Sequence, residues 1–486
     1  LKTGEYKAQK KVLFDGYRAA KGFQKVADRI KSLAFNDDKS GKFFWEITAD
    51  SLIYSANRIP EISDDIINID NAMKWGYGWE LGPFEVWDAM GVQETVSRMK
   101  KENKNVPSWV DDMLSSGRET FYELTNGKRT YYDVLSSSVK TTEDDPKVIN
   151  LSLKKSGNNL IKRDWSASLI DLGDGVLNVE FHSALQPTLN PIDSSMGEVM
   201  NDAMDLLDAG KYKALVIGHE GANFCAGANL ANMIQVIDAK DFDKINNDLK
   251  QFQDLMQRVR FSKAPVVAAP HHMALGGGFE ISAPAVHRVA LGELYMGAVE
   301  IGVGLVPGAG GNLRILLNLT ENSGSGRLNA FQVSQKAFET IAFAKVSSSA
   351  DEAKHLGYLL KSDTIILNND QRIKTAKDKA LSLIDEGYEP PKFRDDLKLP
   401  GTGGRTAIAM VVKGFKAQGK ISEHDEFIAK KLAYILTGGD KAGLTKSVDE
   451  QYLLDIEREA FVSLTGEKLS QDRIRHMLKT GKPLRN

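Results

Sequence analysis

Two glutamates and three consecutive glycines are the residues whose types and spacing could do chemistry. Gly276, Gly277 and Gly278 follow an apolar segment, Glu280 comes two positions later, and Glu300 lies in a second apolar, glycine-rich segment. Glycine lets a substrate carbonyl approach backbone N–H groups that a Cβ would shield. A helix that begins in the triplet would also favour developing negative charge there. The spacing therefore indicates an oxyanion-binding site beside a carboxyl group.

The two carboxyls suit acid–base chemistry next to a bound carbonyl. Glu300 has apolar neighbours, so we expect its pKa to be raised and the group to be able to give a proton. A structural interpretation stays open on spacing alone. Glycine-rich turns often only pack a helix on a strand, and a glutamate in the first turn of a helix, such as Glu280, often only meets the helix dipole.

Several familiar sites are missing from the sequence. It contains no Gly-Lys pair followed by Ser or Thr, no Gly-x-Gly-x-x-Gly between a strand and a helix, and no Gly-x-Ser-x-Gly. The single cysteine, Cys225, excludes an internal disulfide and a thiolate metal cluster, and we expect it to be a small buried residue. His271 and His272 are adjacent and would point apart on a strand, so the sequence predicts no metal site.

Composition places the chain among ordinary globular proteins. Its 486 residues, 42% hydrophobic and 26% charged, predict about two to four domains. Lys and Arg number 63 against 65 Asp and Glu, so charge indicates no nucleic-acid partner. No apolar run has transmembrane length and no signal peptide is recognisable, so we expect no membrane association. The lone cysteine fits a reducing compartment, and we expect a cytoplasmic location, although an organelle matrix would look the same if a transit peptide had been removed.

The first part of the chain, up to about residue 140, has mostly helical spacing of apolar residues. Helical periodicity is present within residues 5–30, and the chain starts at Leu1 instead of Met, so we expect a piece of a longer protein. Residues 139–162 are polar, charged and turn-rich, which predicts a linker.

Two helices of this part have clear boundary signals. The stretch "ISDDIINIDNAMKWGYG" predicts a helix that Ser63 or Asp64 caps and that Gly76 and Gly78 break. The next helix should begin at Pro83 and end before Gly91, which is the favoured placement of proline and glycine.

After Trp165 the pattern changes to alternating strands and helices. Residues 167–181 predict two strands joined by a Gly-Asp-Gly turn. Residues 196–210 and 245–260 have helical spacing, whereas the segments KALVIGHEG and APVVAAP predict short buried strands. This alternation indicates an α/β arrangement with β-α-β crossovers. Beyond about residue 320 the chain is again mainly helical.

Three motifs in this second part occur in a specific order. "NFCAGANL" at 223–230, "ALGGGFE" at 274–280 and the following "GAVEIGVGLVPGAGG" closely resemble the signature of the enoyl-CoA hydratase/isomerase (crotonase) family. The resemblance covers about residues 163–486. It implies a crotonase fold, a ClpP-like α/β spiral of β-β-α units.

The resemblance also implies site residues. The two oxyanion-hole amides fall on Ala228 and Gly277, and the two hydratase carboxyls fall on Glu280 and Glu300. Further substrate contacts are expected at Ala226, Gly227, Leu230, Gly276, Gly278, Pro307 and Gly308.

Three residues depart from the family pattern. His272 stands where a glycine or asparagine turn residue is usual, His287 replaces a common aspartate, and Asn312 in "GGNLR" replaces the usual threonine. These departures put loop contacts in doubt and leave the pair of carboxyls in place.

The N-terminal part resembles a second family. "NIDNAMKWGYGWELGPFEVWDAMGV" at 68–92 is similar to the helical C-terminal domain of 3-hydroxyacyl-CoA dehydrogenases. The resemblance implies an all-α domain at 1–138, a linker at 139–162 and a hydratase domain at 163–486. The NAD-binding domain of that family would lie upstream, so we expect no cofactor in this chain. Packing alone predicts Trp75, Trp79 and Trp87 as core aromatics.

The order of the two resemblances looks like a bacterial bifunctional β-oxidation enzyme with the hydratase placed last. The expected activity is hydration of a trans-2-enoyl-CoA to 3-hydroxyacyl-CoA, with a coenzyme A thioester as substrate. Two alternatives stay open. The chain could be an enoyl-CoA isomerase, which needs one carboxyl, or an assembly module that binds a separate NAD-binding half. A homo-oligomer is expected in each case.

Overall fold

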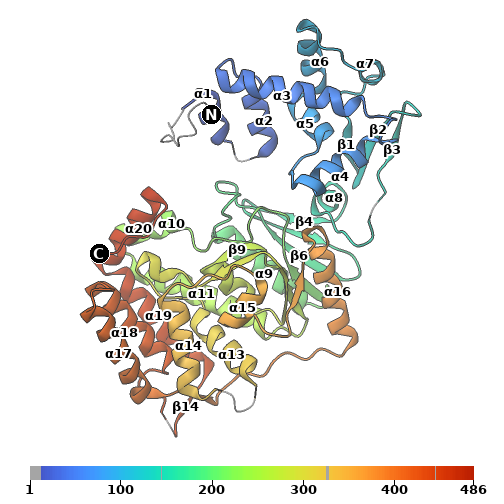
Figure 1. The fold of residues 1–486 in the computed structure, drawn as a ribbon. Coiled ribbons are helices and arrows are strands. Elements are labelled where there is room, and N and C mark those ends of the chain that lie inside the picture. Colours follow the sequence, from blue (N-terminus) through green and yellow to red (C-terminus); the bar gives the residue numbers. More distant parts are fainter. Residues whose placement is uncertain (1–12, 24, 144, 325–327, 444) are drawn as a thin grey trace. The chain divides into compact units, whose positions relative to one another are not determined.

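The computed structural model describes residues 13–23, 25–143, 145–324, 328–443 and 445–486. The chain divides into two compact units, drawn from blue to red along the sequence in Figure 1. The N-terminal unit contains the described residues up to 143 together with Ser156–Asn158, and the C-terminal unit contains Asp145–Lys155 and Asn159–Asn486. The predicted boundary near residue 140 thus lies close to the division between the units.

The N-terminal unit is a set of helices followed by a small sheet. The helices are α1 (Asp15–Lys21), α2 (Val26–Ala34), α3 (Lys39–Ala56), α4 (Ile66–Tyr77), α5 (Pro83–Met90), α6 (Val92–Lys101) and α7 (Ser108–Ser115). The antiparallel sheet has the order β1 (Tyr122–Thr125), β2 (Lys128–Asp133), β3 (Ser138–Thr141). Residues 1–138 therefore do not form the all-α domain that was predicted.

The reason for this difference is local. Asn126 and Gly127 join β1 to β2 with φ values of 50° and 75°. Asn-Gly with two positive φ values is the preferred two-residue hairpin turn, and aromatic and β-branched residues surround it. Turn chemistry here outweighs the helical pattern of the preceding segments.

The helix boundaries follow the sequence signals closely. Helix α5 begins at Pro83 and ends before Gly91, as predicted. Helix α4 ends before Gly78, whose φ is 67°, as predicted, but Gly76 lies within the helix, so the prediction that Gly76 breaks it is wrong. Its cap is Asp65, whose Oδ1 accepts from the N–H of Asn68 at 2.8 Å, so the prediction of Ser63 or Asp64 is wrong by one or two residues. The start of the predicted periodicity at residues 5–12 lies outside the described residues.

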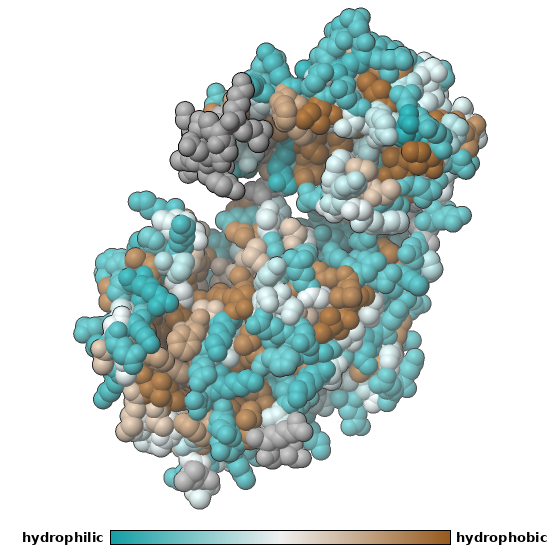
Figure 2. Space-filling model, in the orientation of Figure 1, coloured by the Kyte–Doolittle hydropathy of each residue, from teal (hydrophilic) through white to brown (hydrophobic). Residues whose placement is uncertain are grey.

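The tryptophans of the N-terminal unit divide between core and surface. Trp87 is fully buried and donates its Nε1–H to Thr95 Oγ1 at 2.6 Å. Trp75 and Trp79 are 74% and 45% exposed, so the core prediction is correct for Trp87 alone. Figure 2 shows hydrophobic residues reaching the visible surface among hydrophilic ones.

The C-terminal unit is built on a seven-stranded sheet. Its order is β12 (Thr364–Ile366), β10 (His287–Leu291), β8 (Val266–Ala268), β7 (Ala214–Ile217), β6 (Val176–Phe181), β5 (Ala167–Asp171), β4 (Leu160–Arg163). Strands β4, β5 and β6 pair antiparallel, and the pairs from β6 to β12 are parallel. The unit is therefore mixed α/β, with the predicted strands at 167–181, 213–221 and 264–270 in place.

The helices of the C-terminal unit connect the strands of the sheet or, like α17 (Gly401–Ala417) and α18 (Glu423–Leu436), pack against other helices (Figure 1). They are α8 (Leu151–Ser156), α9 (Ser194–Asp208), α10 (Leu230–Asp238), α11 (Phe242–Arg260), α12 (Gly277–Ser282), α13 (Gly311–Ser323), α14 (Ala330–Ala342), α15 (Ala350–Leu356), α16 (Arg372–Asp385), α17, α18, α19 (Glu450–Thr465) and α20 (Lys468–Thr480), with short 3-10 helices η1 (Glu300–Val303) and η2 (Asn369–Gln371). Two small strands, β13 (Leu397–Lys398) and β14 (Ser447–Val448), pair antiparallel. Strands β5 and β6 with helix α9 make one β-β-α succession.

The segment predicted as a linker, 139–162, has regular structure over much of its length. Strand β3 ends at Thr141, helix α8 follows, and β4 is the edge strand of the large sheet. Ile149 and Leu151 are buried in the core beside this sheet. The polar composition of the segment reflects its surface face, since only a few apolar residues anchor it.

A second, two-stranded parallel sheet positions the glycine triplet. It consists of β9 (His272–Leu275) and β11 (Leu294–Gly297). Strand β9 leads directly into the triplet, and β11 ends three residues before Glu300. The N–H of Gly276 donates to Gly297 O at 2.7 Å, so the two strand ends are tied together at this point.

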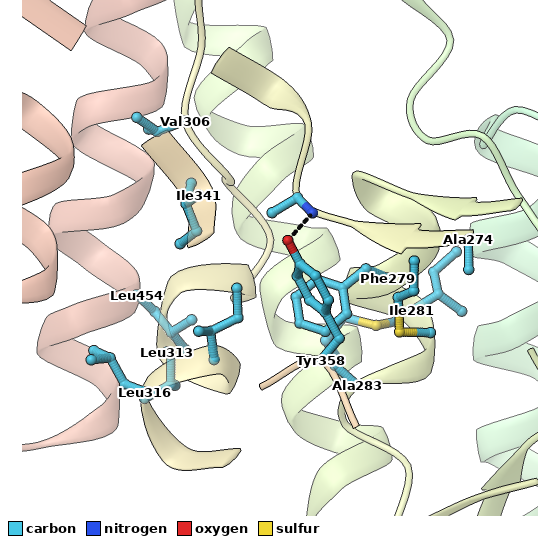
Figure 3. Packing of buried hydrophobic residues seen from close by; sticks show 14 of the residues in the cluster. Ala274, Phe279, Ile281, Ala283, Val306, Leu313, Leu316, Ile341, Tyr358 and Leu454 are labelled. Carbon is cyan, nitrogen blue, oxygen red and sulfur yellow. Dashed lines mark hydrogen bonds between the residues drawn. The ribbon is translucent and has the colours of Figure 1, made fainter. Parts of the chain in front are cut away.

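Helix α12, which follows the triplet, is buried along its whole length. Figure 3 shows its side chains Phe279 and Ile281 among those of other core elements. The rings of Phe279 and Tyr358 meet edge to face with centroids 5.0 Å apart. The Tyr358 hydroxyl accepts from Ala298 N at 3.2 Å, the bond dashed in Figure 3. Packing thus fixes α12 relative to the strand end at Gly297.

Among the described residues, no helix is long and apolar enough to cross a membrane.

Candidate active site

The glycine triplet forms the turn between β9 and α12. Gly276 has φ 52° and ψ −122°, a conformation that favours glycine, and α12 begins at Gly277 as predicted. A Cβ on Gly276 would lie 3.2 Å from Oε1 of Glu300, so the glycine also allows a close approach of that carboxyl. Helix α12 has six residues, so any stabilisation of negative charge at its start comes from its individual N–H groups instead of from the dipole of a long helix.

Two backbone amides meet at this turn. The segment around Cys225 runs beside β9, with Leu275 N donating to Cys225 O at 2.9 Å. A Cβ on Gly277 would lie 3.7 Å from the nitrogen of Ala228. Ala228 is exposed, and within the part of the chain that the structure describes neither its N–H nor that of Gly277 donates to a protein acceptor. The two amides predicted for the oxyanion hole therefore lie close together, and neither has a protein acceptor in the described part of the chain.

Gly278 has a packing role. A Cβ there would lie 2.3 Å from the carbonyl oxygen of Cys225, so a larger residue would push the two segments apart. Cys225 is fully buried, and burial raises the pKa of its thiol to about 12. The prediction of a small buried cysteine is confirmed, and a thiol of this kind is a poor nucleophile.

Glu280 is held by the loop that precedes α13. The residue is 5% exposed, and its Oε1 accepts from Ala309 N at 2.8 Å and from Gly311 N at 2.9 Å. Burial raises the pKa of Glu280, and the hydrogen bonds from the loop amides act in the opposite direction. The backbone thus stabilises the ionised form of a buried carboxyl.

Glu300, in η1, has a different environment. The residue is partly exposed as a whole, but its Oε2 is buried and, among the described residues, has no hydrogen-bond partner. Burial raises the pKa of Glu300 well above its usual value, and the charge of Glu280 adds to the effect. The predicted direction of this shift is confirmed. The carboxyl of Glu300 therefore favours its protonated form more strongly than a solvated carboxyl does.

A third buried carboxyl, Glu457 on α19, lies behind this pair. It accepts from the N–H groups of Gly310 and Asn312, the latter at 3.1 Å. Burial, followed by the charge of Glu280, raises the pKa of Glu457 to about 8. The sequence predictions do not include this residue. Its signal is its place in an apolar helical stripe, with Leu453 four residues before it and Phe461 four residues after it.

The other predicted substrate contacts divide by exposure. Ala226 and Leu230 are partly exposed beside Ala228, whereas Gly227 is buried. Pro307 and Gly308 are buried in the loop before α13. A Cβ on Gly308 would lie 2.6 Å from the Phe461 ring, so packing accounts for this glycine.

The three departures from the family pattern have separate surroundings. His272 has a positive φ of 45° and lines a surface hollow of about 550 Å³ next to Leu275. His287, on β10, binds Thr364 Oγ1 of β12 through Nε2 at 2.9 Å. Asn312 donates its side-chain amide to Glu457 Oε2 at 2.9 Å. In the described chain, no three His, Cys, Asp or Glu side chains are placed to hold a metal ion.

Comparisons with known proteins agree with the chemistry of this site. Residues 185–326 match the family model described as "Enoyl-CoA hydratase/isomerase". A Bacillus subtilis (strain 168) protein named "Probable 3-hydroxyacyl-CoA dehydrogenase" is 43% identical over 486 residues, which cover 100% of this chain and 60% of that protein. The "Short-chain-enoyl-CoA hydratase" of Clostridium acetobutylicum is 27% identical over 199 residues, 40% of this chain and 65% of that enzyme.

This chain thus spans less than two thirds of the length of either curated relative. Among solved structures, an enoyl-CoA hydratase from Bacillus halodurans aligns with a TM-score of 0.43 and 15% identity, over 64% of this chain and 99% of that one. The sequence match includes both carboxyls and both oxyanion amides. Residues 185–326, which carry Glu280 and Glu300, are therefore similar to the enoyl-CoA hydratase/isomerase family.

Proposed function

We propose that this chain is an enoyl-CoA hydratase, which adds water to a trans-2-enoyl-CoA and gives a 3-hydroxyacyl-CoA. One observation carries the proposal. The N–H groups of Ala228 and Gly277, which donate to no acceptor among the described residues, lie next to Gly276. The carboxyl of Glu300 lies against the same glycine. Hydrogen-bond donors to a carbonyl oxygen and a proton donor at its α-carbon are two requirements of this reaction.

The residues divide the reaction as follows. The thioester oxygen accepts hydrogen bonds from the Ala228 and Gly277 amides, which stabilises the enolate-like charge. Glu280 removes a proton from water while the water oxygen bonds to the β-carbon. Glu300 gives its proton to the α-carbon, so that one molecule of water is added across the double bond. The protons exchange before the next turnover.

Electrostatics support this division of roles. Three loop amides oppose the rise in the pKa of Glu280, which favours a carboxylate that can take a proton. Glu300 has an unbonded oxygen and a pKa raised well above its usual value, which favours a carboxyl that can give one. Burial raises the pKa of both carboxyls, and loop amides oppose this rise at Glu280, which makes Glu280 the better candidate for the base and Glu300 the better candidate for the acid.

One observation favours a second candidate, an enoyl-CoA isomerase. The Oε1 of Glu280 already accepts two backbone hydrogen bonds, whereas Oε2 of Glu300 is buried and has no partner among the described residues. Moving a double bond without water needs one such group. The presence of a second buried carboxyl beside the site is the reason to prefer hydration.

The wider role of the chain is also part of the proposal. The relative named for 3-hydroxyacyl-CoA dehydrogenase matches this chain along its whole length, which supports a helical dehydrogenase C-terminal domain before the hydratase. An NAD-binding half would then be the partner of the N-terminal unit, and NAD would bind there instead of in this chain. We further propose a homo-oligomeric, cytoplasmic enzyme of fatty-acid β-oxidation.

Product mass distinguishes the two activities. The chain is incubated with short- and long-chain trans-2-enoyl-CoA thioesters and, separately, with a 3-enoyl-CoA. A hydratase adds the mass of one water to the 2-enoyl substrate. An isomerase converts the 3-enoyl substrate to the 2-enoyl product at unchanged mass. A chain with Gln at both 280 and 300 is the blank, and identical behaviour of the blank and the native chain contradicts the proposal.

A further inference from the structure

We propose that Glu457 is a positioning residue that holds the carboxyl of Glu280 in its working place. It acts through the loop of residues 307–312, which lies between the two glutamates. The proposal rests on the proposed function, since the placement of Glu280 affects turnover only if Glu280 takes part in the reaction.

One side of this loop faces Glu280. The N–H groups of Ala309 and Gly311 both donate to its Oε1, at 2.8 and 2.9 Å. A Cβ on Gly311 would lie 2.9 Å from the same oxygen, so the backbone approaches the carboxyl as closely as glycine allows. The position of Oε1 is therefore set by where this short loop lies.

The other side of the loop faces Glu457. The alternate amides, those of Gly310 and Asn312, donate to its two carboxyl oxygens. Four consecutive N–H groups thus bond in turn to Glu280 and to Glu457. A shift of the loop would break bonds to both carboxyls at once, so α19 fixes the site from behind.

Asn312 strengthens this connection with its side chain. Its Nδ2 donates to Glu457 Oε2 at 2.9 Å and to Pro307 O at 3.1 Å, which joins both ends of the loop to α19. This is the residue that replaces threonine in the family pattern. The side-chain amide of Asn312 and the carboxyl of Glu457 are therefore a hydrogen-bond donor and its acceptor.

Glu457 interacts electrostatically with three charged or titratable groups on neighbouring elements. They are Glu280 of α12, Glu300 of η1 and Arg314 of α13. Burial is the main cause of the raised pKa of Glu457, about 8, and the charge of Glu280 is the next. Once ionised, Glu457 raises the pKa of Glu300. In the alkaline range it therefore helps Glu300 to keep its proton.

The test variant is Glu457→Gln, which keeps the size of the side chain and removes its charge. We expect kcat to fall roughly tenfold to a hundredfold, because small displacements of a reacting group have effects of this size. KM should stay within about twofold, since no substrate contact is lost. The alkaline limb of the kcat profile should move to lower pH, because Glu300 then loses its proton more easily.

The matched control is Glu450→Gln, on the same helix two turns earlier. Glu450 is also buried; its Oε1 accepts from Arg394 N at 3.2 Å, and its Oε2 lies 3.7 Å from Arg314. Its loss should lower the melting temperature without moving the pH profile. This separates a general cost of disturbing a buried glutamate from an effect on the site.

Each outcome decides a different point. A native chain without hydratase turnover overturns the proposed function. An active native chain with normal kcat and pH profile in the folded Glu457→Gln variant overturns the role of Glu457 alone. If that variant does not fold, Asn312→Ala removes only one of the donors to Glu457. It should then lower kcat with the same shift of the alkaline limb, and an unchanged profile counts against the proposal.

Discussion

The N-terminal and C-terminal units both bury carboxyl groups, and they treat them differently. Asp70 accepts from Phe84 N at 2.8 Å through one oxygen and from the Tyr122 hydroxyl at 2.8 Å through the other. Asp88 accepts from Phe121 N at 2.7 Å and from Tyr122 N at 2.9 Å. In both aspartates each oxygen has a partner, and these bonds tie α4 and α5 to the start of β1.

In the C-terminal unit one carboxyl oxygen is left open. Burial raises the pKa of Asp70 and of Asp88 to about 7, so a raised pKa is common to both units. Only Glu300 combines it with a buried oxygen, Oε2, that accepts no hydrogen bond from the described residues. Burial of a carboxyl therefore does not mark a reactive site. The feature that distinguishes the proposed site is a buried carboxyl oxygen without a hydrogen-bond partner among the described residues.

The largest effect is expected at the open carboxyl and its partner. Glu280→Gln and Glu300→Gln keep size and remove proton transfer, so each should lower hydratase turnover by roughly 10²–10⁴. Because both act in one addition step, the double variant should lose far less than the product of the two losses. Stopped assays on the purified variants measure this. Asp70→Asn is the control and should hydrate at the native rate, and a comparable loss there would remove the distinction between the units.

The next effect concerns the glycines. Gly277→Ala keeps its N–H and adds a methyl group where the thioester approaches, so turnover should fall about 10²–10³, as for the loss of one oxyanion donor. The added Cβ would meet only the end of the Ile192 side chain, which can shift. Gly278→Ala would meet the backbone oxygen of Cys225 and should lower stability more. Melting temperature and turnover on the same preparations separate the two, and unfolding of Gly277→Ala with normal activity per folded molecule would show that the triplet is structural.

The smallest effect is on stability in the N-terminal unit. The native pKa of Asp70, about 7, lies above its ordinary value of 3.8, so the folded state holds the proton more tightly than the unfolded state. The free energy of unfolding should therefore fall as pH rises from about 4 to about 7, by at most about 1.4 kcal/mol per pH unit for one group. Asp70→Asn should flatten this slope.

Tryptophan fluorescence during urea unfolding measures the slope, because five of the six tryptophans precede residue 144. Asp15→Asn, at a side chain that is 89% exposed, is the control and should keep the native slope. An unchanged slope in Asp70→Asn would mean that this aspartate does not hold its proton in the folded protein.

Local signals in the sequence were enough for much of the C-terminal unit. The Gly173–Gly175 turn joins β5 to β6 with positive φ at each residue, and helices α9 and α11 and strands β7 and β8 lie at the predicted places. The glycine triplet likewise predicted the turn before α12. These features depend on residues close together in the chain, where periodicity and turn preferences act directly.

Other features depend on distant parts of the chain. Glu457 reaches the site because α19 packs behind the loop before α13, and no local pattern specifies that meeting. Trp75 and Trp79 have the hydrophobic character of core residues, but whether a partner element covers them is decided by tertiary structure. The hairpin at Asn126-Gly127 is a different case, since its turn signal is local and the helical pattern of the preceding segments obscured it.

The buried thiol of Cys225 can be used to measure how often the protein opens around the candidate site. Cys225 is the single cysteine of the chain, it is fully buried, and it lies against Gly278. Alkylating reagents should therefore leave the native protein unlabelled and react only when the structure around this thiol opens. The labelling rate of Cys225 therefore measures how often the residues around it open. A cysteine introduced on the surface can be labelled first, because the buried Cys225 does not compete for the reagent.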